Sequence, residues 1–276
     1  MSDPRRTPVN SRVAAAHLAV RKPGVVPVTG YPRQVVVSVA DLLLRPGGLR
    51  VRQLIWGDEV QVYETRNGVS FVQAKKDGYV GYVPESALAS GEPATHWVRT
   101  AGTHAYSAPD FKAPELRGLS LGSRLRATDI SGRFVQTSHG FVPNAHLADL
   151  NAPVSDPVDV AELLLGTPYL WGGNSRWGID CSGLVQAAFL ACGCDCPGAS
   201  DQQEAELGVV LPDGTPPERG DLLFWNGHVA IVRDKDTLLH ANVHHMAVAL
   251  EPLVAAIERI AAQGDGPVTT HKRVLI

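Results

Sequence analysis

One cysteine and two histidines in the second half of the chain have residue types and a spacing that suit nucleophilic catalysis. Cys181 stands where a loop rich in glycine and aromatic residues turns into an apolar, helix-like stretch at residues 184–191. Backbone N–H groups at a helix N-terminus favour an anion, so a thiol placed there ionises more easily, and the thiolate is the nucleophile. The same N–H groups can hold an oxyanion on the attacked carbonyl. Cys181 is therefore the candidate nucleophile.

A nucleophilic cysteine needs a base, and two histidines further along the chain can supply it. Apolar runs on either side of a turn at residues 234–237 predict an antiparallel hairpin. With the turn centred near Asp234, His228 and His240 lie almost opposite each other, and directly opposed residues share a face. One imidazole can then accept the thiol proton while the other orients it. A lone histidine is more often a core residue, but an opposed pair near a helix-capping cysteine favours catalysis.

The other cysteines and a neighbouring histidine pair have simpler explanations. Cys192, Cys194 and Cys196 are two residues apart, which suits neither the usual zinc spacing nor local disulfide bridging. We expect them to be small, partly buried thiols that follow a helix. His244 and His245 raise a metal hypothesis, but no third ligand with suitable spacing accompanies them. The sequence therefore predicts no metal site and implies no cofactor.

Composition places the chain among ordinary globular proteins and restricts its partners. At 276 residues, with 44% apolar and 19% charged residues, it can hold more than one hydrophobic core. The formal net charge of -3 argues against nucleic acid or an anionic membrane as the main partner. The first residues do not form a convincing signal peptide, and the cysteines are expected to be reduced. Together these features predict a cytoplasmic protein of undetermined oligomeric state.

A repeat in the first half predicts two small all-β domains. Gly-Tyr-Val-Pro at residues 81–84 recurs as Gly-Phe-Val-Pro at residues 140–143, each followed four positions later by leucine. A strand-like stretch opened by glycine, and before it a turn with proline, precede each copy, a pattern typical of a small barrel. We expect an N-terminal arm at residues 1–30 and barrels at residues 31–92 and 93–150.

The pattern changes after a turn-rich linker that begins at residue 151. Asp156 and Pro157 are expected as the cap and first residue of a short helix that runs to Leu165. Helix-like and strand-like stretches follow one another from there. The expected third domain covers residues 151–276.

These motifs resemble those of the NlpC-type papain-like peptidases of bacterial cell-wall metabolism. The resemblance rests on Asp-Cys-Ser-Gly at residues 180–183, on the glycine and apolar strand around His228, and on Leu-His-Ala at residues 239–241. Pro-Tyr-Leu-Trp-Gly-Gly at residues 168–173 and Arg-Gly-Asp-Leu at residues 219–222 belong to the same pattern.

The repeated units resemble bacterial Src-homology-3-like (SH3-like) domains, with Tyr82 and Phe141 in place of a typical tryptophan. Two such domains ahead of the peptidase resemble the gamma-D-glutamyl-L-diamino-acid endopeptidases, also called dipeptidyl-peptidase VI. The implied fold is α+β: two small SH3-like β-barrels followed by a papain-like cysteine peptidase domain. Members of this subgroup cleave L-Ala-gamma-D-Glu from the diamino acid of free murein peptides and require an unblocked N-terminal alanine.

The resemblance implies three catalytic and five substrate-binding residues. Cys181 would be the nucleophile, His228 the general base and His240 the orienting third residue. The substrate-binding set would hold the amine end and the gamma-D-glutamyl pocket, and it comprises Tyr79, Trp171, Asp180, Ser182 and Ser200.

Two departures from the family pattern bear on recognition of the substrate amine. The family's acidic partner in the first barrel has no clear counterpart near Leu49, and Ala199 stands where a polar residue is more usual before Ser200. Amine recognition could therefore be looser here or use another group.

The leading hypothesis is a cytoplasmic peptidase of murein recycling that acts on L-Ala-gamma-D-Glu-diamino acid peptides. The alternatives are an exported peptidoglycan hydrolase whose SH3-like domains bind the cell wall, an amidase or acyltransferase on the same fold, and a binding module with an inactive peptidase domain. Intact Cys181, His228 and His240 argue against the last. Whether the diamino acid is meso-diaminopimelate or lysine, and what the second barrel does, stay open.

Overall fold

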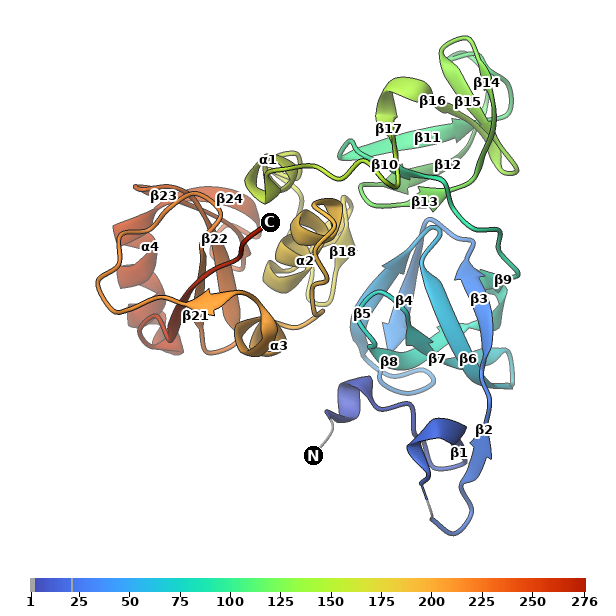
Figure 1. The fold of residues 1–276 in the computed structure, drawn as a ribbon, viewed down its shortest axis with the longest axis horizontal. Coiled ribbons are helices and arrows are strands. Elements are labelled where there is room, and N and C mark those ends of the chain that lie inside the picture. Colours follow the sequence, from blue (N-terminus) through green and yellow to red (C-terminus); the bar gives the residue numbers. More distant parts are fainter. Residues whose placement is uncertain (1–2, 21) are drawn as a thin grey trace. The chain divides into compact units, whose positions relative to one another are not determined.

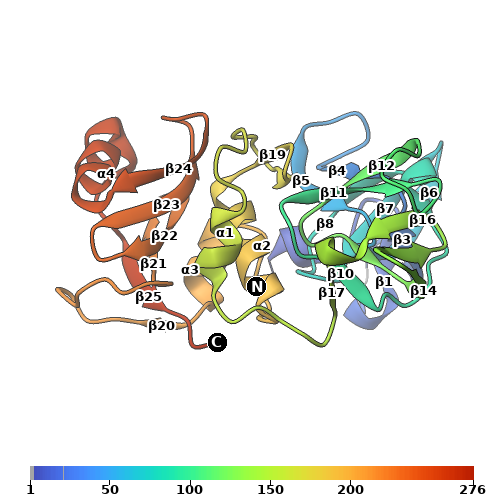
Figure 2. The ribbon, with the colours of Figure 1, turned by 90° about the horizontal axis from the view of Figure 1, so that it is seen from above.

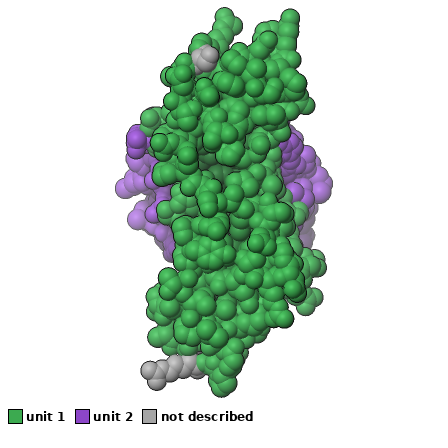
Figure 3. Space-filling view, turned by 90° about the vertical axis from the view of Figure 1, so that its right-hand side faces the viewer, with its two compact units in different colours: residues 1–150 green, residues 151–276 purple. Residues whose placement is uncertain are grey.

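The chain forms two compact units, residues 1–150 and residues 151–276 (Figures 1 and 3). The computed structural model describes residues 3–20 and 22–276. None of the helices in those described stretches is both long enough and apolar enough to cross a membrane.

The first half of unit 1 is a seven-stranded antiparallel sheet in the order β5-β4-β8-β7-β6-β3-β9 (Figure 1). Its elements are β3 (Tyr31–Val35), β4 (Val39–Leu43), β5 (Arg50–Ile55), β6 (Glu59–Arg66), β7 (Val69–Ala74), β8 (Val80–Pro84), the 3-10 helix η3 (Glu85–Ala87) and β9 (Leu88–Ala89). Asn67 and Gly68, both at positive φ, make the tight turn between β6 and β7 that an Asn-Gly pair favours. No ladder among the described residues joins the edge strands β5 and β9, so the sheet is open where a closed barrel was predicted.

The second half of unit 1 repeats this order of elements in two smaller open sheets, β13-β10-β17 and β12-β11-β16-β15-β14. Its elements are β10 (His96–Val98), β11 (Gly102–Tyr106), β12 (Glu115–Ser120), β13 (Arg124–Leu125), β14 (Ala127–Ser131), β15 (Phe134–Thr137), β16 (Gly140–Pro143), η4 (Asn144–His146) and β17 (Leu147–Asp149). A hairpin, a three-strand meander, a 3-10 helix and a short strand follow one another in both halves. The two sequence repeats thus correspond to structural repeats, although neither ladder closes into a barrel.

The N-terminal segment is held against the first half of unit 1. Its elements are η1 (Pro4–Arg6), β1 (Val13–Ala15), η2 (Ala16–Leu18) and β2 (Val26–Val28). Arg12 binds the Glu64 carboxylate through two bonds of 2.6 Å, and Arg6 donates to the Asp77 carbonyl at 3.0 Å. Residues expected only as an arm therefore contact the sheet and the turn that precedes Tyr79.

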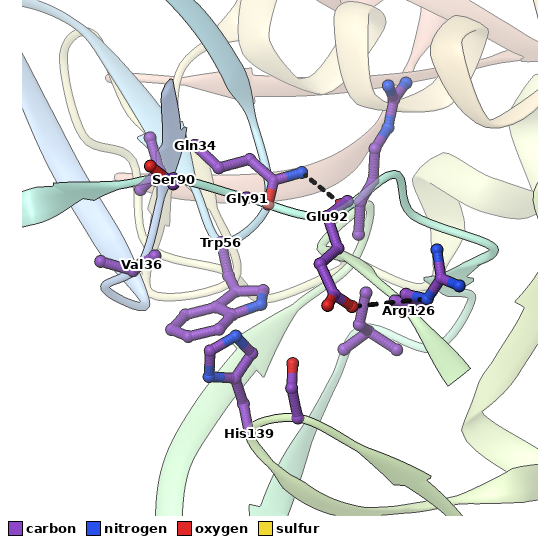
Figure 4. A pocket seen from close by; sticks show the side chains of 12 residues that line it. Gln34, Val36, Trp56, Ser90, Gly91, Glu92, Arg126 and His139 are labelled. Carbon is purple, nitrogen blue, oxygen red and sulfur yellow. Dashed lines mark hydrogen bonds and ion pairs between the residues drawn. The ribbon is translucent and has the colours of Figure 1, made fainter. Parts of the chain in front are cut away.

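A pocket of about 210 Å³ lies between the two halves of unit 1 (Figure 4). Trp56, just after β5, packs into the hydrophobic core of the second half. The His139 ring meets the Trp56 ring edge-on with centroids 4.7 Å apart, and the Arg117 guanidinium lies 4.3 Å from the indole centroid. Gly57 is needed beside Trp56, because a Cβ there would approach the Arg124 carbonyl oxygen to 2.1 Å. The halves therefore share a core across this pocket.

Unit 2 is a six-stranded antiparallel sheet in the order β20-β25-β21-β22-β23-β24 with helices on both sides (Figure 2). Helices α1, α2 and α3 lie on one side and α4 on the other (Figure 2). The elements are α1 (Pro157–Glu162), β18 (Asn174–Ser175), β19 (Gly178–Ile179), α2 (Cys181–Ala191), α3 (Ser200–Glu206), β20 (Val209–Val210), β21 (Leu222–Trp225), β22 (His228–Asp234), β23 (Thr237–Asn242), β24 (Ala247–Pro252), α4 (Leu253–Ile260), the π-helix η5 (Ala261–Asp265) and β25 (Thr270–Arg273).

Local signals in the sequence explain where the two helices nearest the candidate site begin and end. The Asp156 carboxylate accepts from the Val158 N–H at 2.8 Å, with Pro157 as the first residue of α1, as predicted. Helix α1 ends at Glu162, a few residues before the predicted end. Helix α2 begins at Cys181, and Gly193 at positive φ follows its end.

Candidate active site

Asp180 fixes the start of helix α2 and thereby the position of Cys181. One carboxylate oxygen of Asp180 accepts from the Gly183 N–H at 2.6 Å and from the Ser182 hydroxyl at 3.0 Å. The other accepts from the Gly172 N–H at 2.9 Å. Asp180 thus caps the helix and ties the preceding loop to it. Cys181 is the first residue of the helix, as predicted, and it is only 5% exposed.

Tyr169 lies beside the cysteine and was not among the predicted site residues. Burial, together with the charges of Cys181 and Asp180, raises the pKa of the Tyr169 hydroxyl, so the phenol stays protonated and can donate. A β-bridge to Ile179 holds the Tyr169 backbone. Its place in the aromatic and glycine-rich motif at residues 168–173 was the available signal.

The two predicted histidines are in direct contact. His228 Nε2 lies 3.0 Å from His240 Nδ1, and the ring centroids are 5.2 Å apart. Helix α2 packs against β22 and β23, the strands that carry these two residues. Cys181 and the two histidines are therefore carried by elements that pack against one another.

The predicted register of the hairpin was wrong by two residues. Ile231 pairs with Leu239, and a bulge between Val232 and Asp234 shifts the pairing near the turn. Counting from this last pair of the ladder, His240 lies one residue further along β23 and His228 lies three residues away along β22. The two histidines are therefore diagonal neighbours and are not directly opposed. Diagonal neighbours still share a face and remain within reach of long side chains.

A carboxylate and a guanidinium behind His240 were not predicted. His240 Nε2 lies 3.0 Å from Glu251 Oε2 on β24. Arg259 on α4 binds both oxygens of Glu251 at 2.7 Å. Glu251 is 7% exposed. A continuous row of polar contacts therefore runs from His228 across β23 and β24 to α4.

Burial keeps both histidines uncharged. It lowers the pKa of His228 to about 3 and that of His240 to about 4. The Glu251 carboxylate opposes this effect on His240. Arg259 holds the pKa of Glu251 at about 2, so the carboxylate stays charged. At neutral pH each imidazole has one lone pair, which is the form that can accept a proton.

The remaining predicted residues divide between the two units. Trp171 is 69% exposed on the loop before Cys181, and the Ser182 hydroxyl is engaged by Asp180. Ser200 is the first residue of α3, a helix tied to α2 by a 2.9 Å bond from the Gln203 amide to the Ser182 carbonyl. Tyr79 is buried in unit 1, and this burial raises the pKa of its hydroxyl, with smaller effects from the charges of Arg52, Arg5, Asp3 and Asp77.

The other three cysteines are buried or half-buried, whereas His244 and His245 are exposed. Cys192 and Cys196 are buried, Cys194 is half-buried, and none of the three forms a disulfide bond. Burial raises the pKa of Cys192 to about 12 and also raises that of Cys194. The His244 and His245 rings lie 4.7 Å apart, but the described residues contain no group of three or more metal-ligating side chains.

The candidate nucleophile, the histidine pair and the surrounding fold are the arrangement expected of a cysteine hydrolase domain. Residues 166–258 match the NlpC/P60 family, a family of cysteine hydrolases, and residues 44–88 match the bacterial dipeptidyl-peptidase Sh3 domain. The chain therefore carries an NlpC/P60 domain and a bacterial dipeptidyl-peptidase SH3 domain.

Similar proteins agree with this assignment. A gamma-D-glutamyl-L-lysine dipeptidyl-peptidase of Bacillus subtilis (strain 168) is 39% identical over 100 residues, 36% of this chain and 31% of that protein. A dipeptidyl-peptidase 6 of Lysinibacillus sphaericus is 36% identical over 102 residues, 36% of each chain. This chain thus matches about a third of the length of these relatives. The crystal structure of an NlpC/P60 family protein from Bacillus cereus ATCC 10987 has the same fold, with a TM-score of 0.75 at 19% identity over 89% of this chain and 100% of that one.

Proposed function

We propose that this protein is a cysteine endopeptidase that hydrolyses the gamma-D-glutamyl–diamino acid bond of murein peptides with a free N-terminal L-alanine. The observation that carries the proposal is the contact between His228 and His240 on the strands against which the Cys181 helix packs. The names of the two dipeptidyl-peptidases support the choice of bond. We further propose that it acts in the cytoplasm, on peptides released during cell-wall recycling.

The proposed reaction passes through a thioester on Cys181. The thiol proton moves to His228 while the sulfur attacks the gamma-glutamyl carbonyl carbon, and the N–H groups at the start of α2 stabilise the oxyanion. His228 then returns the proton to the amine of the diamino acid as the C–N bond breaks. Water then attacks the thioester carbonyl and gives a proton to His228, which passes it to the sulfur as the C–S bond breaks, releasing the acid and restoring the Cys181 thiol.

The proposed amine recognition places charge beside the nucleophile. Asp180 uses both carboxylate oxygens in backbone and hydroxyl contacts, yet its negative charge remains next to Cys181 and attracts a substrate ammonium. An N-acetylated amine carries no positive charge, so this attraction would be lost. Trp171, Ser182 and Ser200 keep their proposed role in the glutamyl pocket, and Tyr79 keeps its proposed role at the amine end.

Two peptides that differ only at the amine test this proposal. We expect purified protein to hydrolyse L-Ala-gamma-D-Glu-L-Lys or its meso-diaminopimelate analogue, and to leave the N-acetylated forms uncleaved. Comparing the two free peptides identifies the diamino acid. Equal cleavage of free and acetylated peptides contradicts amine recognition, and activity that survives Cys181→Ala contradicts the mechanism.

Intact peptidoglycan distinguishes the proposal from an exported hydrolase whose SH3-like domains bind the cell wall. If the protein releases peptides from whole sacculi as fast as it cleaves free tripeptide, the wall hydrolase is the better account. Cleavage of the free peptide alone supports recycling.

A further inference from the structure

The second unit contains a buried carboxylate that the proposed reaction does not use. Glu251 lies on β24, and its direct partner across the ladder is Leu238, two residues before His240. Glu251 and His240 are therefore diagonal neighbours on one face of the sheet, joined by the 3.0 Å contact to His240 Nε2. Arg259 holds both Glu251 oxygens from α4 and also donates to Gln263 at 2.7 Å.

The chemistry of these groups fixes where the protons are. A charged carboxylate only accepts hydrogen bonds, so the 3.0 Å contact requires the proton of His240 to be on Nε2. A neutral imidazole has one N–H, so Nδ1 of His240 must be an acceptor. The 3.0 Å contact from His228 Nε2 to that nitrogen then requires His228 to donate from Nε2. The basic nitrogen of His228 is thereby Nδ1.

We propose that Glu251 is a positioning residue: its carboxylate sets the tautomer of His240 and so decides which nitrogen of His228 is basic. Arg259 keeps this carboxylate charged and oriented through a two-point contact, which a planar guanidinium provides and a lysine does not. When His228 takes the thiol proton, it becomes a positively charged imidazolium. The negative charge of Glu251 stabilises this imidazolium through His240, which contacts both residues. The effect on turnover rests on the proposed peptidase function, whereas the tautomer itself does not.

The tautomer can be measured without any substrate, by NMR of the ring nitrogens in protein with isotope-labelled histidine. We expect His240 to carry its proton on Nε2 and His228 on Nε2 in the native protein. Glu251→Ala should give a mixture of His240 tautomers. Glu251→Gln should keep the native tautomer, because the amide oxygen can still accept. An unchanged Nε2–H tautomer in Glu251→Ala overturns the proposal even if the protein proves inactive on murein peptides.

Turnover gives a second test with a predicted sign. The charged and titratable groups that act on the histidine pair are His245 beyond β23, Glu251 on β24 and Arg259 on α4, with Asp265 beside Arg259. Removing the negative charge of Glu251 should make the His228 imidazolium harder to form, and removing the positive charge of Arg259 should make it easier to form. The acid limb of the profile of kcat against pH should therefore move to lower pH in Glu251→Gln and to higher pH in Arg259→Gln.

The expected falls in kcat distinguish a positioning role of Glu251 from a loss of protein stability. We expect kcat to fall about tenfold in Glu251→Gln and on the order of a hundredfold in Glu251→Ala, with KM nearly unchanged. Asp221→Asn is the matched control, because Asp221 is also buried and bound by an arginine and a histidine. It should lower the melting temperature without moving the acid limb. Shifts of the same sign in Glu251→Gln and Arg259→Gln, or an equal shift in Asp221→Asn, contradict the proposal.

Discussion

The second unit contains two buried clusters of the same composition, and only one of them reaches the candidate site. Glu251 binds Arg259 and His240, while Asp221 binds Arg273 at 2.7 Å and His271 at 2.8 Å.

The difference lies in what each histidine touches next. His240 contacts a second histidine, His228, on the strand against which α2 packs. His271 lies on β25, a strand that pairs with β21 and β20, and its cluster joins that strand to the turn before β21. A carboxylate, an arginine and a histidine are therefore not a catalytic signature by themselves. Their place relative to a nucleophile decides what they do.

The largest expected contrast is in activity. His228→Ala removes the proposed general base and should lower kcat by about 10²–10⁴-fold. His271→Ala removes the corresponding imidazole of the other cluster and should leave kcat within about twofold, while it lowers the melting temperature. Steady-state kinetics on the free murein tripeptide and thermal denaturation measure both effects. If His271→Ala lowers kcat as much as His228→Ala does, the two clusters do not differ as described.

A smaller contrast is expected in how stability depends on pH. The folded pKa values of His228 and His240 lie below the ordinary value of about 6.5, so the unfolded chain binds more protons below that pH. The free energy of unfolding should therefore fall as the pH drops from about 6.5 toward about 4. Burial alone would raise the pKa of Asp221, but hydrogen bonds, of which that from Arg273 is the strongest, lower it below its ordinary value of 3.8. The contribution of Asp221 to the free energy of unfolding is therefore lost only below about pH 3.8.

Variants separate these two windows in chemical denaturation at several pH values. His228→Gln with His240→Gln should flatten the slope between about pH 6.5 and 4. Asp221→Asn should leave that slope in place and weaken the further loss at lower pH. A double glutamine variant with an unchanged slope would show that the buried histidines do not set the pH dependence.

Much of the site was predictable because its signals are local. The Asp156–Pro157 start of α1, the position of Cys181 at the beginning of α2 and the Gly193 stop are confirmed. The tight turn at Asn226 and Gly227 is also confirmed, with Gly227 at positive φ. Each of these depends on a few neighbouring residues whose backbone preferences are strong.

The parts that were missed depend on distant pairing. The hairpin turns at Lys235 and Asp236, not at Asp234, and this is why His228 does not lie directly opposite His240; the bulge after Val232 takes back only one residue of that shift. The role of Glu251 could not be predicted from the sequence around it. Glu251 reaches His240 only because β24 pairs with β23 in a register that makes the two residues diagonal neighbours, and no local signal predicts that register. The open edges of the sheets in unit 1 likewise depend on which strands pair, and hydrophobic alternation alone does not determine this.

Reaction of the four cysteines with iodoacetamide tests the central claim most directly. The raised pKa values of Cys192 and Cys194 keep them as thiols, whereas Cys181 lies at a helix N-terminus. We expect peptide mapping by mass spectrometry to show that loss of peptidase activity follows the alkylation of Cys181 one for one at neutral pH. Full activity with Cys181 alkylated, or inactivation that follows Cys192, Cys194 or Cys196 instead, would contradict the assignment of the nucleophile.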